Sequence, residues 1–241
     1  MQIIQLNIRH LKIFKPDDIS RTMQSLIPDT SFHIYNHANG FENVFREAEN
    51  YRFFLEKYQL HISPIAETYA YCLMPNHFHL VVRIRKREVI EELIRNKKES
   101  LAINSSKVSN FGRVDIASDD EIEKFLSKQF SNLFSSYTQS FNKVYKRMGS
   151  LFIKNFKREP IYDKTHFLNA VVYTHRNPIH HGFCKGFEDW PHSSYNAILY
   201  GAESIAESEK LLKMTGGKDG FIEIHKQKLD RYESLTRFDI P

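Results

Sequence analysis

The stretch from Tyr69 to Arg85 constrains the fold of this chain more than any other segment. It is YAYCLMPNHFHLVVRIR, with two aromatic and β-branched runs separated by Pro75-Asn76. This pattern predicts a strand, a tight turn and a second strand. The second strand begins with His77 and His79, and residues at i and i+2 on a strand point to the same face of the sheet. The two histidines are placed either to share one metal ion or to lie half-buried in a sheet, and the local pattern leaves both interpretations open.

The other periodic segments complete an α+β pattern. Residues 31–37 alternate as a strand, and residues 47–58 place apolar side chains every three or four positions, as one face of a helix does. A longer helix is predicted over 122–148, and residues 151–162 indicate a last strand or strand pair. The order strand, helix, strand, strand, helix, strand is that of the ferredoxin-like or RRM-like fold, an antiparallel β-sheet with helices packed on one face.

We divide the chain into three parts on this basis. Residues 1–30 form an N-terminal extension of unknown role, residues 31–200 form the main domain, and residues 201–241 form a helical C-terminal extension. Within the main domain, residues 86–120 are charged at first and then rich in serine and asparagine. They predict a long exposed insert, with a short helix at 88–95.

Composition limits the compartment and the partners. Lys and Arg number 34 against 29 Asp and Glu, and the pI is near 9.0, a balance that permits a polyanionic partner without requiring one. Cys72 and Cys184 form neither a disulfide framework nor a CxxC motif, which suits a reducing cytoplasm. The first residues lack the pattern of a secretion signal, and no stretch approaches ~20 consecutive apolar residues. We therefore expect a cytoplasmic protein with no membrane partner.

A metal bound by the two imidazoles needs further ligands. The chain has no HExxH, paired CxxC or EF-hand loop to supply them. A helix predicted from 165 to about 177 offers an alternative, because Tyr173 and Asn177 lie at i and i+4 and so project from one face. The amide oxygen of Asn177 can join His77 and His79 to complete a site for a hard divalent ion, Mg²⁺ or Mn²⁺. Tyr173 would then lie one helical turn from the metal.

This arrangement has a chemical use. A phenol has an unperturbed pKa of about 10 and is a poor nucleophile at neutral pH, but a site that favours its deprotonated form allows it to attack. A metal ion that polarises a phosphodiester stabilises charge on the phosphoryl oxygens and on the leaving 3′-oxygen. Attack by Tyr173 would leave a 5′-phosphotyrosine and a free 3′-OH. Because the adduct preserves the phosphodiester, strand transfer can follow without ATP.

Four motifs occur in the order YCLMPNHFHLVV, GSLFIKNFKREPI, YTHRNPIHHG and WPHSSY. Together, over about 32–199, they resemble the REP-associated tyrosine transposases of the insertion-sequence-200-like, single-tyrosine branch of the HUH superfamily. The resemblance implies that His77 and His79 bind the metal, that Tyr173 is the nucleophile, and that Asn177 occupies the place of a polar third ligand. It also implies a metal-dependent endonuclease and strand transferase that acts on single-stranded DNA beside an imperfect palindromic hairpin.

A basic segment follows the long predicted helix. Between 143 and 158 there is no acidic residue, and aromatic side chains are interleaved with the charges. Charge runs usually form a solvated face, but beside a nuclease site basic groups can contact phosphates and aromatic rings can stack on unpaired bases. The end of the histidine strand can extend this track. The candidate DNA contacts are Arg83, Arg85, Lys143, Lys146, Arg147, Lys154, Lys157 and Arg158.

Other functions remain open on the sequence. One is a domesticated protein on the same fold that binds single-stranded DNA or RNA hairpins without chemistry, but the presence of His77, His79 and Tyr173 together favours the enzyme. Another is a metal hydrolase with an HxH pair in a barrel, which needs about 250 residues of repeated strand and helix that are not evident here. The resembling family includes monomers and dimers, and we expect a monomer. Three histidines near the tyrosine helix are interpreted as phosphate contacts or exposed side chains: His175, His180 and His181.

Overall fold

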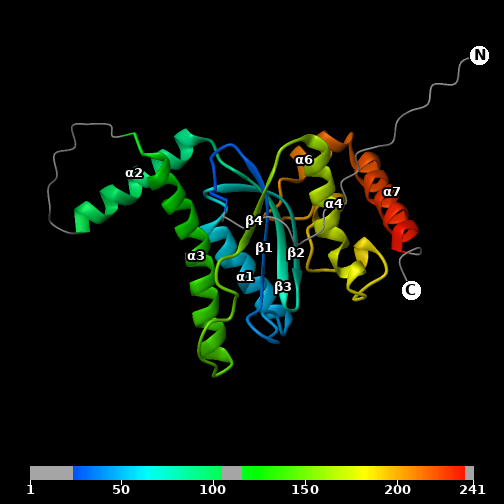
Figure 1. The fold of residues 1–241 in the computed structure, drawn as a ribbon, viewed down its shortest axis with the longest axis horizontal. Coiled ribbons are helices and arrows are strands. Elements are labelled where there is room, and N and C mark those ends of the chain that lie inside the picture. Colours follow the sequence, from blue (N-terminus) through cyan, green and yellow to red (C-terminus); the bar gives the residue numbers. More distant parts are fainter. Residues whose placement is uncertain (1–23, 105–115, 237–241) are drawn as a thin grey trace, which may run out of the picture.

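The centre of the protein is a sheet of four antiparallel strands. The computed structural model describes residues 24–104 and 116–236. The strand order is β2-β3-β1-β4, and every neighbouring pair is antiparallel (Figure 1). This is the arrangement of a ferredoxin-like sheet, so the predicted α+β class is confirmed. The strands are β1 (Ser31–His37), β2 (Ala66–Met74), β3 (His77–Ile84) and β4 (Lys157–Ile161).

Two helices cover the first face of the sheet. α1 (Ala48–His61) and α3 (Asp119–Val144) pack against each other and share one core with the strands (Figure 1). α3 begins where the Ser118 side chain accepts a hydrogen bond from the backbone N–H of Glu121. Its apolar residues at helical spacing are buried from Ile122 to Phe141, whereas Val144 at its end is exposed. The core of this face includes Phe32, Ile34, Phe54, Tyr58, Phe78, Leu80, Phe130 and Leu133.

A second set of helices lies on the opposite face. α4 (Lys164–His180) contacts β2 and β3, and its core includes Val81 and Val171 (Figure 1). The predicted packing of helices on one face describes α1 and α3, and α4 adds a layer on the other face. The reason is that β2 and β3 are buried along almost their whole length, which requires cover on both sides. The elements after α4 are η1 (Phe187–Asp189), α5 (Tyr195–Tyr200), α6 (Ser208–Thr215) and α7 (Lys218–Thr236).

The prediction of a long exposed insert at 86–120 is wrong over its first part. Most of that part forms one helix, α2 (Arg87–Asn104), which contacts α3. Ile90 and Ile94 are buried, and Leu93 packs against the same core. These three residues have helical spacing, but the many charged residues around them obscured the pattern. Residues 105–115 of the insert lie outside the described residues.

Two element boundaries also differ from the sequence prediction. α3 ends at Val144 rather than near 148, because the chain turns where Lys146 and Gly149 have positive φ values of 50° and 85°. The strand predicted from 151 is reduced to an isolated bridge at Phe152, followed by β4. Asn155, with φ of 66°, interrupts the extended chain between them.

The two terminal extensions are described only in part. In the N-terminal one, Leu26 is buried and Asp29 forms an ion pair with Arg83 of β3. The C-terminal one contains α6 and α7. Residues 1–23 and 237–241 lie outside the described residues. Within the described ranges, no helix combines the length and the apolar character that crossing a membrane requires.

Candidate active site

The pairing of β1 with β3 gathers polar rings on the second face of the sheet. His37 is opposite His77, and Tyr35 is opposite His79, in an antiparallel register. His33 precedes Tyr35 by two residues and therefore points to the same side. Ile34 and Phe78, which alternate with these residues, face the first core. The strands thus place a row of imidazole and phenol groups below α4.

α4 carries the other two candidate residues over this row. The helix begins at Asp163, whose side chain accepts a hydrogen bond from the backbone N–H of residue 166 at 2.8 Å. Phe167 anchors its first turns against β2, with its ring 5.0 Å from that of Tyr69. This packing places Tyr173 and Asn177, one helical turn apart, above the histidines of β3. The four residues proposed as ligands and nucleophile therefore lie together.

His77 is held between two asparagine side chains. Its Nδ1 lies 2.7 Å from Asn76 Oδ1, and its Nε2 lies 2.8 Å from Asn177 Oδ1. Burial lowers the pKa of His77 to about 4. The hydrogen bond to Asn177 raises it by a smaller amount, and the nearby imidazoles of His37 and His181 lower it slightly further. The ring is therefore neutral at pH 7 and can donate its single proton to only one of the two oxygens. The other ring nitrogen carries a lone pair that can accept from an amide N–H or bind a cation.

The contact between these two side chains also has dimensions that suit a metal ion. Adjacent ligands of an octahedral divalent ion with bonds of ~2.1 Å lie ~3 Å apart. His77 Nε2 and Asn177 Oδ1 are separated by 2.8 Å. In the part of the chain that the structure describes, no group of three His, Cys, Asp or Glu side chains could hold a metal ion. A three-ligand site with His77 and His79 therefore requires a ligand of another type, such as the Asn177 amide.

His79 is oriented by an imidazole that the sequence analysis did not single out. Its Nδ1 lies 3.0 Å from His33 Nε2, and the two rings are nearly parallel. Burial lowers the pKa of His33 to about 4 and that of His79 well below 6.5, so both rings are neutral at pH 7. The contact occupies Nδ1 of His79 and leaves Nε2 available as a ligand. The sequence did hold a signal for this contact. His33 and His37 lie four residues apart on the predicted first strand, so their side chains share one face of the sheet.

Tyr173 lies at the open side of the site. Its ring meets those of His79 and His33 edge-on, with centroids 5.5 and 5.6 Å away. Its side chain is 40% exposed, whereas His77 and His79 are 3% and 5% exposed. A large substrate can therefore reach the phenol while the candidate ligands remain shielded from bulk water.

Two more imidazoles form the rim of the site. The ring of His37 stacks on that of His77 with centroids 4.7 Å apart, and the ring of His181 lies 5.2 Å from His77. Both rim side chains are exposed, as predicted for His181. Burial of part of the ring and the proximity of His181 lower the pKa of His37. The rim offers N–H donors to an anionic group beside His77.

Comparisons with known proteins point to one family. No family model matches the chain. A Haemophilus influenzae protein curated under the name REP-associated tyrosine transposase is 22% identical over 171 residues, which is 69% of this chain and 73% of the relative. A solved REP-associated tyrosine transposase bound to a REP hairpin matches with a TM-score of 0.51 and 15% identity, over 78% of this chain and 90% of that chain. The resemblance to the REP-associated tyrosine transposases is confirmed. At this identity the solved structure shows a shared fold.

The motif that resembles the REP-associated tyrosine transposases also contains a buried histidine. His175 was predicted to be exposed or to contact phosphate, and it is 1% exposed. Its Nδ1 lies 2.9 Å from His225 Nε2, and its Nε2 lies 2.8 Å from Ser194 Oγ. His225 Nδ1 donates to the Phe221 carbonyl at 2.7 Å, and Ser194 Oγ accepts from a backbone N–H of β2 at 3.0 Å. The prediction was wrong because α7 covers this side of α4, behind Tyr173.

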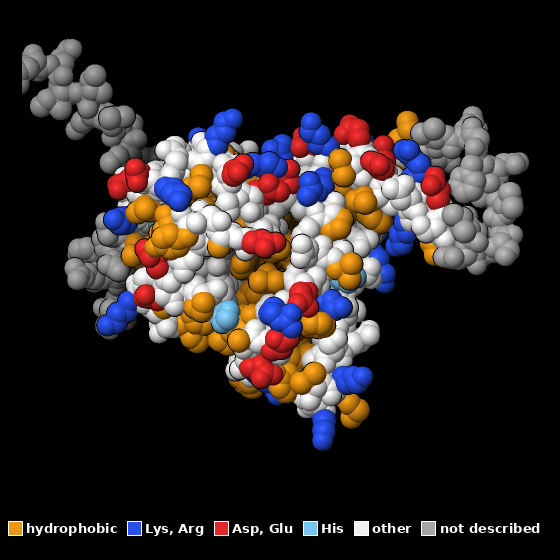
Figure 2. Space-filling model, turned by 180° about the vertical axis from the view of Figure 1, so that it is seen from behind, with side chains coloured by type: hydrophobic (Ala, Val, Ile, Leu, Met, Phe, Trp, Pro, Cys, Tyr) orange, Lys and Arg blue, Asp and Glu red, His pale blue; other side chains and the backbone are white. Residues whose placement is uncertain are grey.

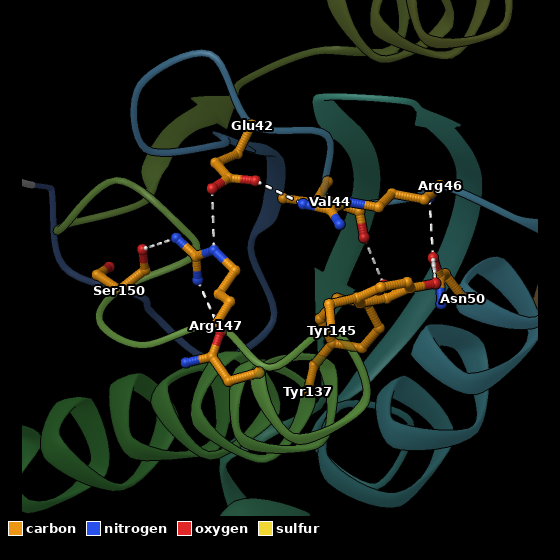
Figure 3. A network of polar contacts seen from close by, with 9 residues as sticks. Glu42, Val44, Arg46, Asn50, Tyr137, Tyr145, Arg147 and Ser150 are labelled. Carbon is orange, nitrogen blue, oxygen red and sulfur yellow. Dashed lines mark hydrogen bonds and ion pairs between the residues drawn. The ribbon is translucent and has the colours of Figure 1, made fainter.

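Arg147, one of the predicted DNA contacts, is engaged within the protein. Figure 3 shows its guanidinium between Glu42 and Ser150. It donates to the Glu42 carboxylate at 3.0 Å, to the Asn142 side chain at 2.7 Å and to the Ser150 carbonyl at 2.9 Å. Only 16% of its side chain is exposed. These bonds tie the turn after α3 to the loop after β1, which is a structural role.

Three other predicted contacts are also engaged with protein groups. Arg158 is buried on the first face and donates to Ser127 Oγ at 3.0 Å. Arg83 pairs with an aspartate and Arg85 donates to a backbone carbonyl, and both lie at the end of β3 away from His77. The eight predicted basic residues therefore do not form one surface. Those that are exposed near the end of α3 and the start of β4 are Lys143, Lys146, Lys154 and Lys157.

Proposed function

We propose that this protein is a metal-dependent, single-stranded DNA endonuclease and strand transferase that acts beside hairpins. The observation that carries the proposal is the position of Tyr173 against His79, one helical turn from Asn177, whose Oδ1 faces His77 Nε2. The comparisons support it, because the similar proteins are tyrosine transposases and one of them is bound to a REP hairpin.

His77 Nε2, His79 Nε2 and Asn177 Oδ1 would hold the divalent ion, Mg²⁺ or Mn²⁺. When bound, such an ion supplies Lewis-acid polarisation of a phosphodiester. The protein keeps its ligands ready for this role, because burial lowers the pKa of His77 to about 4 and leaves its lone pair available at neutral pH. The contact of His33 Nε2 with His79 Nδ1 fixes the orientation of the His79 ring.

Tyr173 would act as the nucleophile. A bond forms between its Oη and the scissile phosphorus, while the bond from phosphorus to the 3′-oxygen breaks and the departing oxygen takes up a proton to become a 3′-OH. The phenolic proton passes to solvent, which reaches the exposed side of Tyr173. Attack of a 3′-OH on the phosphotyrosine then forms a new phosphodiester and releases Tyr173. The number of phosphodiester bonds is unchanged over the two steps.

The DNA would lie over the open side of this site. The exposed lysines between α3 and β4 can contact phosphates, and His37 and His181 can donate to a phosphate beside His77. We further propose that the protein works in the cytoplasm, since both of its cysteines are free thiols. We also propose that it acts as a monomer. A non-catalytic hairpin-binding protein is the second candidate, and the assembled tyrosine–histidine–asparagine geometry favours the enzyme.

The test is a covalent-capture assay. The protein is incubated with Mn²⁺ or Mg²⁺ and labelled single-stranded oligonucleotides that carry the palindromes flanking its gene, and the products are separated by denaturing electrophoresis. We expect a labelled band at the mass of the protein, lost in Tyr173→Phe and on chelation.

A matched control is Tyr162→Phe, because Tyr162 is also an exposed tyrosine, 78% accessible, just after β4. This variant should form the adduct as the unmodified protein does. Binding of the palindromes with no adduct from any of them would support the non-catalytic candidate. An adduct that survives Tyr173→Phe would refute the assignment of the nucleophile.

A further inference from the structure

Two loops lie side by side at the end of the sheet where His77 begins β3. The first, residues 39–43, follows β1, and the second, residues 146–155, precedes β4. The backbone N–H of Asn39 donates to the Leu151 carbonyl at 2.8 Å, and the N–H of residue 38 donates to the Asn76 carbonyl at 2.7 Å. The two loops are therefore joined to each other and to the turn that leads into His77. We refer to them together as the loop pair.

The loop pair is held in shape by specific contacts. Arg147 in the second loop reaches Glu42 in the first and the Ser150 carbonyl in its own loop (Figure 3). Positive φ values at Lys146 and Gly149 set the path of the turn around Arg147. The outward side chains of the loop pair are thus presented by a backbone that the protein has fixed.

These outward side chains are apolar and basic. Phe41 is fully exposed, Met148 is 91% exposed and Ile153 is 46% exposed. Lys146 and Lys154 are exposed beside them, and neither forms an ion pair with a carboxylate in the described part of the chain. The turn after α3 is the lowest part of the molecule in Figure 1, and in Figure 2 lysine or arginine and hydrophobic side chains project at that tip. Exposed apolar side chains on a fixed loop indicate a binding surface.

The carboxylate in the loop pair does not offset this charge. Glu42 is bonded to both Arg46 and Arg147, and these contacts lower its pKa below the usual value for a glutamate. The outer surface therefore combines flat or flexible apolar groups with unpaired cations. Unpaired nucleotides offer the complementary groups, because their base faces are free to stack and their phosphates are anionic. A duplex hides its base faces, and so it would use only the cations.

We propose that the loop pair binds the unpaired nucleotides next to the DNA hairpin, with Phe41 and Met148 against base faces and Lys146 and Lys154 against phosphates. This inference rests on the proposed function and assigns a surface for the single-stranded part of the substrate. The position of the surface suits that role, because the loop pair adjoins the turn before His77. A strand held there would be delivered to the phosphate that Tyr173 attacks.

The test compares two DNA probes in binding assays with the full chain carrying Tyr173→Phe, which prevents cleavage. One probe is a blunt hairpin, and the other is the same hairpin with a single-stranded flank of ~6 nucleotides. We expect Phe41→Ala/Met148→Ala to weaken binding of the flanked hairpin by about fivefold or more, since stacking on a side chain contributes substantially to each base contact. Binding of the blunt hairpin should be unchanged.

Charge is tested separately through the dependence on salt. For the flanked probe, Lys146→Gln/Lys154→Gln should reduce the slope of log K against log[salt] by about 1.4, because each lost single-strand phosphate contact removes ~0.7. Matched controls lie elsewhere on the surface: Leu60→Ala is an exposed apolar change on α1, and Lys128→Gln/Lys213→Gln is a double charge change on α3 and α6. Neither control should alter the difference between the probes.

The results separate this inference from the proposed function. Equal effects of Phe41→Ala/Met148→Ala on both probes, or no effect on either, would overturn the assignment of the loop pair to unpaired nucleotides. A change in self-association instead of DNA affinity would overturn it in favour of a protein contact. Formation of a covalent adduct by the unmodified protein tests the chemistry alone. An enzyme that does not use the loop pair would form the adduct but bind both probes equally after Phe41→Ala/Met148→Ala. A non-catalytic binder that uses the loop pair would form no adduct but lose affinity for the flanked probe.

Discussion

His77 Nε2 and Asn177 Oδ1 lie 2.8 Å apart, although a hundred residues separate them in the chain. One atom belongs to the first residue of β3 and the other to the last turns of α4. The contact joins a strand that could hold a metal to the helix that carries Tyr173. It therefore connects the position of the nucleophile to the position of the candidate ligands.

Asn177 is the first residue to test. Asn177→Leu removes the oxygen and should lower the apparent affinity for Mn²⁺ in cleavage by at least about tenfold. Asn177→Asp supplies a charged oxygen at the same place and should retain cleavage with a requirement for less metal. A metal titration of adduct formation measures both. Equal metal dependence in all three proteins would remove Asn177 from the proposed site.

His33 should act through His79 rather than on the substrate. His33→Ala leaves Nδ1 of His79 without its partner at 3.0 Å, so the ring can turn. We expect metal affinity to fall by about 10- to 100-fold, the usual effect of losing an outer-shell partner, with hairpin binding retained. His61→Ala, a histidine in the last turn of α1 on the first face of the sheet, is the control. If both variants titrate with metal alike, His33 has no orienting role.

His225 predicts a dependence of stability on pH. Burial lowers its pKa to about 4, against 6.5 for an unperturbed histidine. The unfolded chain therefore takes up this proton at a higher pH than the folded chain. Titration of His225 does not lower the free energy of unfolding above pH 6.5. As the pH falls from 6.5 toward 4, it lowers that free energy by about 1.4 kcal/mol for each pH unit. In His225→Gln, which cannot titrate, the free energy of unfolding should fall less between pH 7 and pH 5.

Urea unfolding at those two pH values measures this difference. Gln at 225 keeps an oxygen that can accept from His175 Nδ1, so the variant is expected to fold with the contact between α7 and α4 in place. Identical changes in the free energy of unfolding for both proteins would show that His225 is not titrating between its folded and unfolded values.

Arg147 and Lys146 are adjacent and should behave differently. Arg147→Ala removes bonds to Glu42, Asn142 and Ser150 and should lower the free energy of unfolding by about 1–3 kcal/mol. Lys146→Ala removes an exposed cation. It should change the free energy of unfolding by less than about 0.5 kcal/mol while weakening DNA binding. Thermal unfolding together with a DNA-binding assay separates the two effects. A stable Arg147→Ala protein with weakened DNA binding would restore the role predicted from the sequence.

Much of the candidate site was accessible from the sequence because it depends on neighbours along the chain. The shared face of His77 and His79 follows from the two-residue repeat of a strand, and the shared face of Tyr173 and Asn177 follows from the turn of a helix. The order of the periodic segments was enough to predict the sheet class. The helix at Ile90 was underestimated because charged residues surround its short apolar stripe.

Contacts between distant segments were decided only by the tertiary structure. His33 meets His79 because the register of β1 against β3 sets which residues face each other. Arg147 was assigned to DNA from the local run of basic residues, and His175 was assigned to the surface from its position on the tyrosine helix. The partners that enclose them come from the loop after β1 and from α7. The sequence by itself determined which side chains share a strand face or a helix face, since those relations are local. Burial and hydrogen-bond partners depend on what packs across from each element, and that is a property of the folded chain alone.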